Sequence, residues 1–326
     1  MKHITILVPN GEGNNLSSIV GAYKILSRAN AYAKQKGRGD LLSIQLAGVS
    51  KSVEYYDGLF SVRPHTSISA ISKTDLIIIP SLNHNYQEAV SQNKAMIEWI
   101  EEQHSQGAEV ASICTGAFLL ASSGLLNGRS CSTHWAATES FRMLFPEVKL
   151  EADKLITDEK GIYTNGGAYS FLNLIIYLVE KYCDRETAIY CSKVFQIEMD
   201  RNTQSEFAIF TPQKLHCDEM VKKAQAYIEA GLHEKISMEE LSSKFAVSRR
   251  NFDRRFIKAT GNTPGEYSQR VKIEAAKKAF ESSQKTVNEV MYEVGYTDLK
   301  AFREVFRKIT GISPMEYQGK FNRERV

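Results

Sequence analysis

The sequence lacks two features that mark membrane-spanning and disulfide-bonded proteins. Over 326 residues no apolar run approaches the roughly 18 residues that cross a bilayer, and the first run, Ile4–Val8, is too short for a signal peptide. We therefore expect a cytoplasmic protein with no membrane partner. The cysteines are few, odd in number and without a CxxC pair, so we expect neither a disulfide framework nor a metal site. They are Cys114, Cys131, Cys183, Cys191 and Cys217.

A strong overall charge is also missing, but the charge is unevenly distributed. The net charge is only +3, yet residues 213–326 carry 22 Lys and Arg against 16 Asp and Glu, a net +6, and the residues before them carry a net −3. A basic C-terminal part is typical of a module that binds a polyanion such as nucleic acid. The balance of 43% hydrophobic and 24% charged residues is that of a globular protein, and the length predicts two domains.

The first 200 residues alternate between strand and helix patterns. Runs rich in Ile, Leu and Val, as buried parallel strands require, fall at Ile4–Val8, Leu42–Val49, Leu76–Ile79 and Val110–Ile113. Helical patterns fall at Leu16–Lys34, Tyr86–His104, Gly116–Ser123 and Ala168–Tyr182. This order predicts a doubly wound, flavodoxin-like α/β domain over residues 1–204.

The last part of the chain repeats itself. Phe252–Tyr267 matches Phe302–Tyr317 without a gap, and both copies end in Gly-x-[Ser/Thr]-Pro-x-Glu-Tyr. Each copy follows another amphipathic helix and a tight turn, which lies at Ala246-Val247 in the first copy and at Gly295-Tyr296 in the second. Helix, turn and capped helix form a helix-turn-helix, so residues 217–326 are predicted to be an all-α domain with two such units. Residues 205–216 show no clear periodicity and are interpreted as a linker.

Helix starts in this domain are marked by capping residues. Ser237 and Glu240 have the spacing of a capping box, in which each side chain bonds the other residue's backbone N–H. Ser248 is predicted to cap the second helix of the first unit, and Thr297 or Asp298 the second helix of the second unit.

The second helix of each unit has a polar outward face. Phe252 and Phe256 turn inward, as do Phe302 and Phe306, so the residues between them face solvent. Arg and Lys reach guanine edges or phosphates, and Asn is suited to adenine. An ordinary solvated helix face is the alternative, but the duplication and the caps favour DNA contact. The predicted DNA contacts are Arg249, Arg250, Asn251, Arg254, Leu299, Lys300 and Arg303.

Residues 217–326 resemble the DNA-binding domain of the AraC/XylS family. Six steps separate Ala246 from Phe252 and seven separate Gly295 from Phe302, an inequality shared with the family. Ala246 replaces the family's usual glycine, so we expect slight strain in that turn. The resemblance implies that a long helix, about Gly265–Ser282, holds both units for successive major grooves of double-stranded DNA. It also favours activation of transcription, with RNA polymerase as a further partner.

One segment of the α/β part carries chemistry. Val110–Ala121 has the pattern of strand, sharp turn and helix, and it puts Cys114 where an α/β hydrolase places its nucleophile. A thiol at a helix N-terminus is expected to have a lowered pKa. His134, in Ser132–Trp135, is a candidate partner for nucleophilic catalysis.

These motifs, together with Leu125–Arg129 and Asn165–Gly167, resemble PfpI-like domains of the class I glutamine-amidotransferase-like superfamily. They are most similar to the amidase-type sensor domains that are fused to AraC helix-turn-helix units. Enzymes of the superfamily usually place a Glu near the nucleophile. Here Glu12 stands in the first loop, while the better-aligned position is the non-ionisable Asn15, so we expect an incomplete catalytic set and no enzymatic activity.

Three interpretations of Cys114 stay open. It is an inert core residue, or a working nucleophile or redox switch, or part of a pocket that binds a small-molecule effector. The pocket residues would be Cys114, Thr115, His134, Glu12 and Asn15. The favoured hypothesis is a transcription regulator, without a cofactor, whose α/β domain senses an effector or forms a homodimer. The alternative is an amidase-like or thiol-dependent hydrolase that carries a DNA-binding domain.

Overall fold

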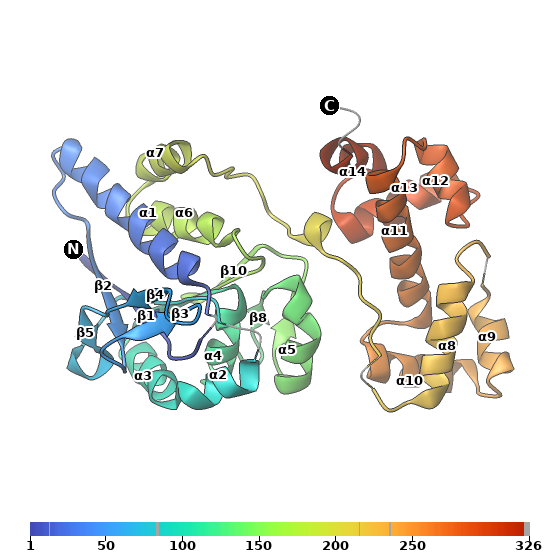
Figure 1. Ribbon diagram of the computed structural model, residues 1–326, viewed down its shortest axis with the longest axis horizontal. Helices are drawn as coiled ribbons and strands as arrows, with labels where there is room; N and C mark the ends of the chain where they lie inside the picture. The colour runs from blue at the N-terminus through green and yellow to red at the C-terminus, as the bar shows by residue number, and fades with distance from the viewer. Residues whose placement is uncertain (13, 83–84, 215, 235, 323–326) are drawn as a thin grey trace. The chain divides into compact units, whose positions relative to one another are not determined.

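The computed structural model describes residues 1–12, 14–82, 85–214, 216–234 and 236–322 (Figure 1). The chain divides into two compact units, Met1–Gln204 and Ser205–Val326. Residues 205–216, interpreted above as a linker, are therefore part of the second unit. The two units are described separately below.

A seven-stranded sheet, in the order β10-β11-β7-β6-β1-β2-β5, forms the centre of the first unit. Its strands pair in parallel, except for the antiparallel edge pair β10–β11. The strands are β1 (Lys2–Val8), β2 (Leu42–Gly48), β5 (Thr66–Ser67), β6 (Leu76–Ile79), β7 (Glu109–Ile113), β10 (Ile156–Glu159) and β11 (Ile162–Asn165). The four predicted strands correspond to β1, β2, β6 and β7, and the predicted flavodoxin-like α/β class is confirmed.

Helices cover both faces of this sheet (Figure 1). One face packs against α1 (Leu16–Gln35), α6 (Phe171–Tyr182) and α7 (Arg185–Phe195). The other packs against α2 (Tyr86–Gln92), α3 (Lys94–Ser105), α4 (Ala117–Ser122) and α5 (Thr138–Leu144). Successive residues of a strand point to opposite faces, so Ile6 contributes to the first core and Leu7 to the second. Contact with a core on each face explains why these strands are rich in Ile, Leu and Val.

The predicted helix Tyr86–His104 is wrong in one respect, because it is broken at Asn93 into α2 and α3. The Asn93 side chain accepts a hydrogen bond from the Asn10 N–H at 2.8 Å and donates to the Asn10 and Ala89 carbonyl oxygens at 3.0 and 2.8 Å. Asn side chains compete with the backbone in this way and end helices. The break ties α2 to the loop that follows β1.

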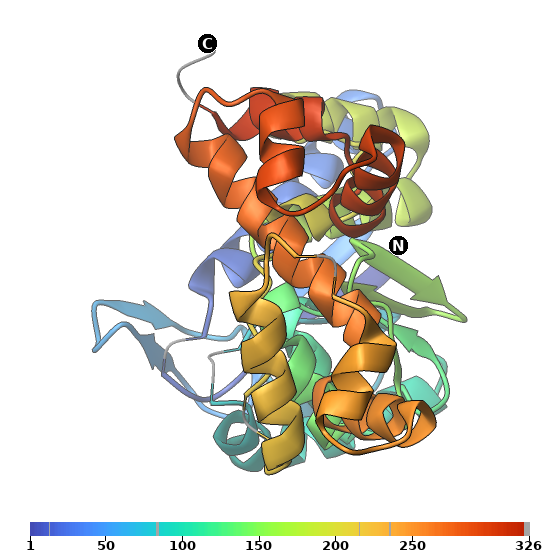
Figure 2. The same ribbon diagram turned by 90° about the vertical axis from the view of Figure 1, so that its right-hand side faces the viewer.

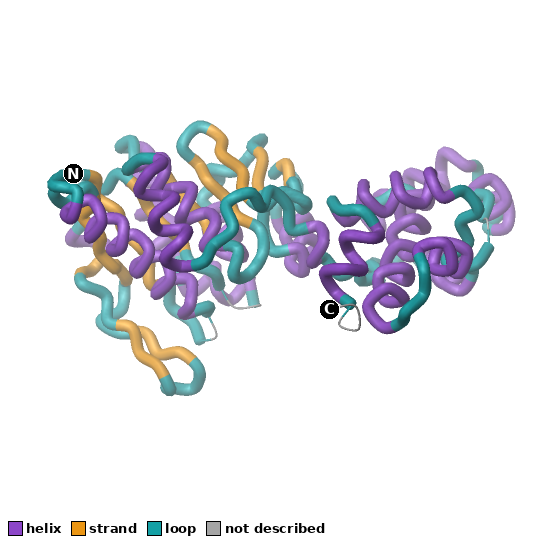
Figure 3. Tube along the Cα trace, turned by 90° about the horizontal axis from the view of Figure 1, so that it is seen from above, coloured by secondary structure: helices purple, strands orange, loops and turns teal. Residues whose placement is uncertain are grey.

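Several short elements lie outside the main sheet. They are the hairpin β3 (Val53–Tyr55) and β4 (Phe60–Val62), the strands β8 (Ser130–Cys131) and β9 (Lys149–Leu150), and the 3₁₀ turns η1 (Ile68–Ala70), η2 (Cys114–Gly116) and η3 (Trp135–Ala137). The β3–β4 hairpin projects from the unit (Figures 2 and 3) and exposes Tyr56, Leu59 and Phe60. Of these short elements, the sequence predicted only the sharp turn at η2.

The described residues of the second unit form helices joined by short turns, with no strand among them (Figure 3). The helices are η4 (Ser205–Phe207), α8 (Glu219–Ala230), α9 (Met238–Lys244), α10 (Arg249–Thr260), α11 (Pro264–Ser282), α12 (Val287–Glu293), α13 (Leu299–Thr310) and α14 (Pro314–Phe321). They enclose two cores, and the long helix α11 contributes to both (Figure 2). The phenylalanines predicted to face inward, Phe252, Phe256, Phe302 and Phe306, are fully buried.

The predicted class of the second unit, all-α with two helix-turn-helix units, is thereby confirmed. In the part of the chain that the structure describes, no helix has both the length and the apolarity to cross a membrane.

Candidate functional site

The second helix of each helix-turn-helix unit begins at a side-chain cap. Ser248 Oγ accepts from the Asn251 N–H at the start of α10, and Asp298 Oδ1 accepts from the Ala301 N–H at 2.7 Å at the start of α13. Both predicted caps are therefore present. In the second helix-turn-helix unit, where Thr297 and Asp298 were the two candidates, the cap is Asp298. Each cap fixes where its helix begins and thus which side chains the helix presents.

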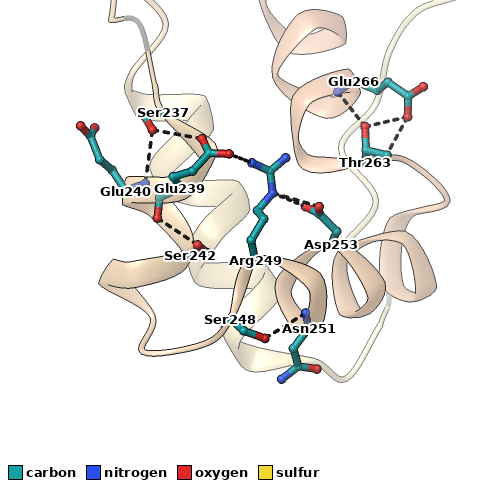
Figure 4. A network of polar contacts seen from close by, with 10 residues as sticks. All are labelled: Ser237, Glu239, Glu240, Ser242, Ser248, Arg249, Asn251, Asp253, Thr263 and Glu266. Atoms are coloured by element: carbon teal, nitrogen blue, oxygen red, sulfur yellow. Dashed lines mark hydrogen bonds and ion pairs between the residues drawn. The ribbon is translucent and has the colours of Figure 1, made fainter.

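The capping box predicted at Ser237 is only half formed. Ser237 Oγ accepts from the Glu240 N–H at 3.3 Å, but the Glu240 side chain points away and returns no bond that the structure describes (Figure 4). The Glu240 carboxylate lies at an exposed position, where water satisfies it as well as the backbone would. Complete capping boxes stand instead at the starts of α11, α12 and α14, formed by Thr263 with Glu266, Thr286 with Glu289, and Ser313 with Glu316.

The turn residues of the two units adopt the same left-handed backbone conformation. Ala246 has φ +52° and Gly295 has φ +74°. A Cβ atom on Gly295 would lie 2.7 Å from the His233 carbonyl oxygen, so only glycine fits there without a shift of backbone. Ala246 is exposed and has room for its methyl group, but its conformation is strained, as predicted from the sequence.

Three of the predicted DNA contacts are exposed cations. Arg250 on α10 and Lys300 on α13 occupy equivalent positions of the repeat, and Arg303 lies one turn beyond Lys300. None of the three has a hydrogen bond or ion pair with another described residue. Their charges are thus available to a partner outside the chain.

The remaining predicted contacts have partners within the protein. Arg254 donates to the Asn251 side-chain oxygen at 3.0 Å, which holds both residues on the outer face of α10. Leu299 is half-buried and packs against the core of the second helix-turn-helix unit, so only part of its side chain faces outward.

Arg249 lies between two carboxylates (Figure 4). Its Nε is 2.8 Å from Asp253 Oδ1 on the same helix, and its Nη1 is 2.5 Å from Glu239 Oε1 on α9. The arginine therefore connects α9 and α10, the two helices of the first helix-turn-helix unit. The repeat places Leu299 and Arg303 at the positions of Arg249 and Asp253, so the second helix-turn-helix unit lacks the equivalent ion pair.

The α/β unit has the predicted sharp turn after β7. Cys114 has φ +54° and only 4% of its surface is exposed. Gly116 packs so closely on the end of β6 that a Cβ atom would lie 2.6 Å from the Pro80 carbonyl oxygen and 2.8 Å from that of Ile79. We call residues 114–116 the elbow.

Hydrogen bonds tie the elbow to the loops that follow β1 and β6. Thr115 Oγ1 is 2.9 Å from Ser81 Oγ, accepts from the Leu82 N–H at 2.9 Å and donates to the Leu82 carbonyl oxygen at 2.9 Å. The Ser81 carbonyl oxygen in turn accepts from the Asn15 N–H at 3.0 Å. Three loops at the carboxyl edge of the parallel sheet are thereby held together, as expected for a site in an open α/β sheet.

The expectation of a lowered pKa at Cys114 is wrong. Burial raises the pKa of the Cys114 thiol above its usual value, and hydrogen bonds from Ser81 and Thr115 only partly oppose this. The helical segment beyond the thiol consists of η2 and the six-residue α4, too short for a strong dipole. The thiol is accordingly neutral near pH 7.

The other predicted pocket residues occupy the surrounding loops. His134 Nδ1 accepts from the Ala136 N–H at 3.1 Å, so the neutral ring carries its proton on Nε2. The neighbouring Thr133 donates to the Cys114 carbonyl oxygen at 3.0 Å, which joins the His134 loop to the elbow. Asn15 uses its side chain to cap α1 at Ser17, and Glu12 is exposed.

Two further polar residues at this sheet edge escaped the sequence interpretation as site residues. Ser112 Oγ on β7 and Asn165 Oδ1 on β11 are buried and have no hydrogen-bond partner among the described residues. The Asn165 amide group donates to the Leu155 and Ser170 carbonyl oxygens. Buried polar atoms without partners are uncommon in folded proteins. Within the described ranges, no group of three or more His, Cys, Asp or Glu is arranged to hold a metal ion.

Comparison with known proteins identifies both units. Residues 5–181, more than half of the chain, match the DJ-1/PfpI family. The chain belongs to the DJ-1/PfpI family. Residues 241–320 match a helix-turn-helix domain, and this domain is of the AraC type. The predicted resemblance is confirmed for both parts of the chain.

Two similar curated relatives span both domains. The chain is 26% identical over 303 residues to the HTH-type transcriptional regulator GbdR of Pseudomonas aeruginosa, covering 92% of this chain and 80% of that protein. It is 22% identical to the HTH-type transcriptional regulator CdhR of the same species, covering 93% and 88%. This DJ-1/PfpI protein is thus a transcription regulator with a helix-turn-helix DNA-binding domain.

Solved structures match the fold of the first unit. A putative transcriptional regulator from Vibrio parahaemolyticus superimposes with a TM-score of 0.53 and 24% identity, covering 59% of this chain and 98% of that one. A THiJ/PfpI family protein from Pseudomonas syringae gives a TM-score of 0.51 and 17% identity, covering 75% and 87%. At these identities the match shows the fold alone.

Proposed function

We propose that this regulator binds two half-sites on double-stranded DNA through α10 and α13, and that its elbow binds a small-molecule effector. The observation that carries the DNA part is the duplication itself. Two capped helix-turn-helix units share α11, and each presents at the same repeat position an exposed cation, Arg250 or Lys300, that has no bond to another described residue. Tandem units of this kind suit successive major grooves about one helical turn apart.

The predicted DNA contacts fall into groups according to whether their polar groups already have partners within the described part of the protein. Arg250, Lys300 and Arg303 reach base edges or phosphates. Asn251 and Arg254, already bonded to each other, approach DNA as a pair, with the Asn251 amide suited to adenine. Leu299 offers its exposed part to a thymine methyl group. Arg249, by contrast, is a positioning residue, because Glu239 and Asp253 occupy its guanidinium.

Binding measurements on two duplexes test these roles. Arg250→Ala and Lys300→Ala should each weaken binding to a selected operator by roughly 5- to 150-fold, which corresponds to about 1–3 kcal/mol for one bidentate base contact. Their effect on a scrambled duplex should be much smaller. Lys223→Ala on α8 also removes an exposed cation that makes no described hydrogen bond or ion pair. It is the matched control and should leave the preference for the operator unchanged. Equal losses on both duplexes would contradict the assignment of Arg250 and Lys300 as base readers.

The elbow suits binding better than catalysis. The Cys114 thiol is buried and neutral, and His134 Nδ1 is occupied by a backbone N–H. Ser112 and Asn165 supply buried polar atoms without a described partner at the same sheet edge. We therefore propose no enzymatic role. In cells, Cys114→Ala should weaken the response to effector at most and not abolish it, because the thiol is proposed to contact the effector and not to perform catalysis. Turnover of amides by the purified wild-type protein, lost in Cys114→Ala, would contradict this proposal.

We further propose that the regulator activates transcription as a homodimer, with RNA polymerase as a partner. Two tandem DNA-binding domains on paired operators would add avidity. The exposed Tyr56, Leu59 and Phe60 of the β3–β4 hairpin supply an apolar surface of the kind that self-association buries. Sedimentation of the full chain, compared with the Leu59→Lys variant, tests the dimer. A promoter fused to a reporter tests the direction of regulation.

A further inference from the structure

Gln204, the last residue of the first unit, holds the loop that carries His134. Its Nε2 donates to the Thr133 carbonyl oxygen at 2.8 Å, and its Oε1 accepts from the Trp135 N–H at 3.3 Å. The second N–H of Nε2 donates to the Ala152 carbonyl oxygen at 2.7 Å. The side chain is 1% exposed, and both of its N–H groups are used. Gln204 thus closes on the residues before and after His134, and we call this set of bonds the clasp.

The same loop is bonded to the elbow. Thr133 Oγ1 donates to the Cys114 carbonyl oxygen at 3.0 Å. Gly166, which follows Asn165 of the candidate site, is pressed against the clasp, since a Cβ atom there would lie 2.2 Å from Gln204 Nε2. A change in the shape of the elbow therefore reaches the Gln204 side chain through one residue, Thr133.

The chain after Gln204 is anchored independently to the second unit. Glu206 pairs with Lys320 of α14 at 2.9 Å. The Ala208 carbonyl oxygen accepts from Lys277 at 2.5 Å, and the Phe210 N–H donates to Glu274 at 3.1 Å. Lys277 and Glu274 lie on α11, the helix shared by both helix-turn-helix units, and their side chains are nearly buried. Between the clasp and the first of these anchors stands one residue, Ser205.

We propose that Gln204 couples the elbow to DNA binding. A ligand that displaces the 133–135 loop weakens the clasp, and DNA that displaces the anchored chain after Ser205 weakens it from the other side. This inference rests on the proposed effector site and on the proposed DNA contacts. Because coupling between two sites is reciprocal, DNA alone serves as the probe and no effector has to be known.

The test is amide hydrogen exchange of the full-length protein with and without a selected operator duplex. In the wild type, DNA should increase exchange of the Trp135 amide several-fold, because this N–H is bonded to Gln204. In Gln204→Ala the same amide should exchange fast already without DNA and show no further response. Gln204→Asn keeps the amide group but shortens its reach by one methylene, and it should behave in the same way even if Gln204→Ala folds poorly.

Thr203→Ala is the matched control. It removes a neighbouring side-chain bond, from Thr203 Oγ1 to the Asp153 carbonyl oxygen at 2.8 Å, that does not reach the His134 loop. This variant should keep the DNA-dependent change at Trp135.

Two outcomes overturn the coupling while the proposed DNA function stands. One is wild-type protein that binds the duplex with no change at Trp135, and the other is a DNA-dependent change that persists in both Gln204 variants. Failure of the wild type to bind any selected duplex would overturn the proposed function and this inference together.

Discussion

Ala246→Gly and Gly295→Ala, at the turns of the two helix-turn-helix units, should change the free energy of unfolding in opposite directions. Alanine in the left-handed conformation costs about 1–2 kcal/mol. Glycine at the same position removes this strain, but it destabilises the folded state by roughly 0.4–1 kcal/mol because the unfolded chain gains conformational entropy. Ala246→Gly should therefore stabilise the second unit by about 0.5–1 kcal/mol.

Gly295→Ala should have the opposite effect and a larger one. The new methyl group would meet the His233 carbonyl oxygen at 2.7 Å, and this oxygen is backbone that cannot rotate away. Overpacking of this kind typically costs about 1–3 kcal/mol, in addition to the left-handed strain. A net loss of about 2–4 kcal/mol is expected.

Urea unfolding of the full chain separates the two units by their signals. Trp99 and Trp135, the only tryptophans in the sequence, both belong to the first unit, while far-ultraviolet circular dichroism also reports the helical second unit. With a denaturant slope of about 1–3 kcal/mol per molar, Ala246→Gly should raise the dichroism midpoint by a few tenths of a molar. The tryptophan fluorescence midpoint should not move and is the internal control. An unchanged or lowered dichroism midpoint for Ala246→Gly would refute the strain argument.

Two further predictions concern ionisation. Burial raises the pKa of Cys114, so its alkylation by iodoacetamide, followed by peptide mass spectrometry, should be slow at pH 7 and accelerate above pH 9, whereas fast alkylation at neutral pH would mean an accessible thiolate. The Arg255 guanidinium beside Asp218 holds the pKa of that carboxyl below its usual range, so its contribution to stability is present above about pH 4 and is lost as pH falls through the lower folded pKa. Asp218→Asn keeps the cap on α8 without the charge, so the urea midpoint followed by circular dichroism should depend less on pH between pH 5 and 3. A pH dependence identical to that of the wild type would show that Asp218 does not contribute.

Elements that combine a long pattern with burial were predictable from the sequence. The strands β1, β2, β6 and β7 are rich in Ile, Leu and Val because they lie between the two cores, and the 50-residue repeat reveals both helix-turn-helix units at once. The strain at Ala246 was expected from the resemblance to the AraC/XylS family, which usually has glycine at this turn. The strand β11, by contrast, is four residues long and ends in the buried polar pair Thr164 and Asn165, so its composition does not resemble a core strand.

Features that depend on partners distant in the sequence were not predictable. Periodicity puts Arg249 on the outward face of α10, but its neutralising partner Glu239 comes from a different helix. Position at a helix start suggested a low pKa for Cys114, whereas burial, which decides the outcome, is a property of the folded unit. The described partners of the Gln204 side chain are all backbone carbonyl and N–H groups, which leave no signature in residue types.

The measurement that tests the central claim most directly is selection of binding sites from a random DNA pool with the full-length protein, followed by hydroxyl-radical footprinting of the selected duplex. Two enriched blocks about one helical turn apart, roughly 10 base pairs between centres and protected on one face of the helix, are predicted. Lys300→Ala should lose protection in one block only, and Arg250→Ala in the other. A single enriched block, or loss of both blocks together in each variant, would contradict a tandem reader in which α10 and α13 contact separate half-sites.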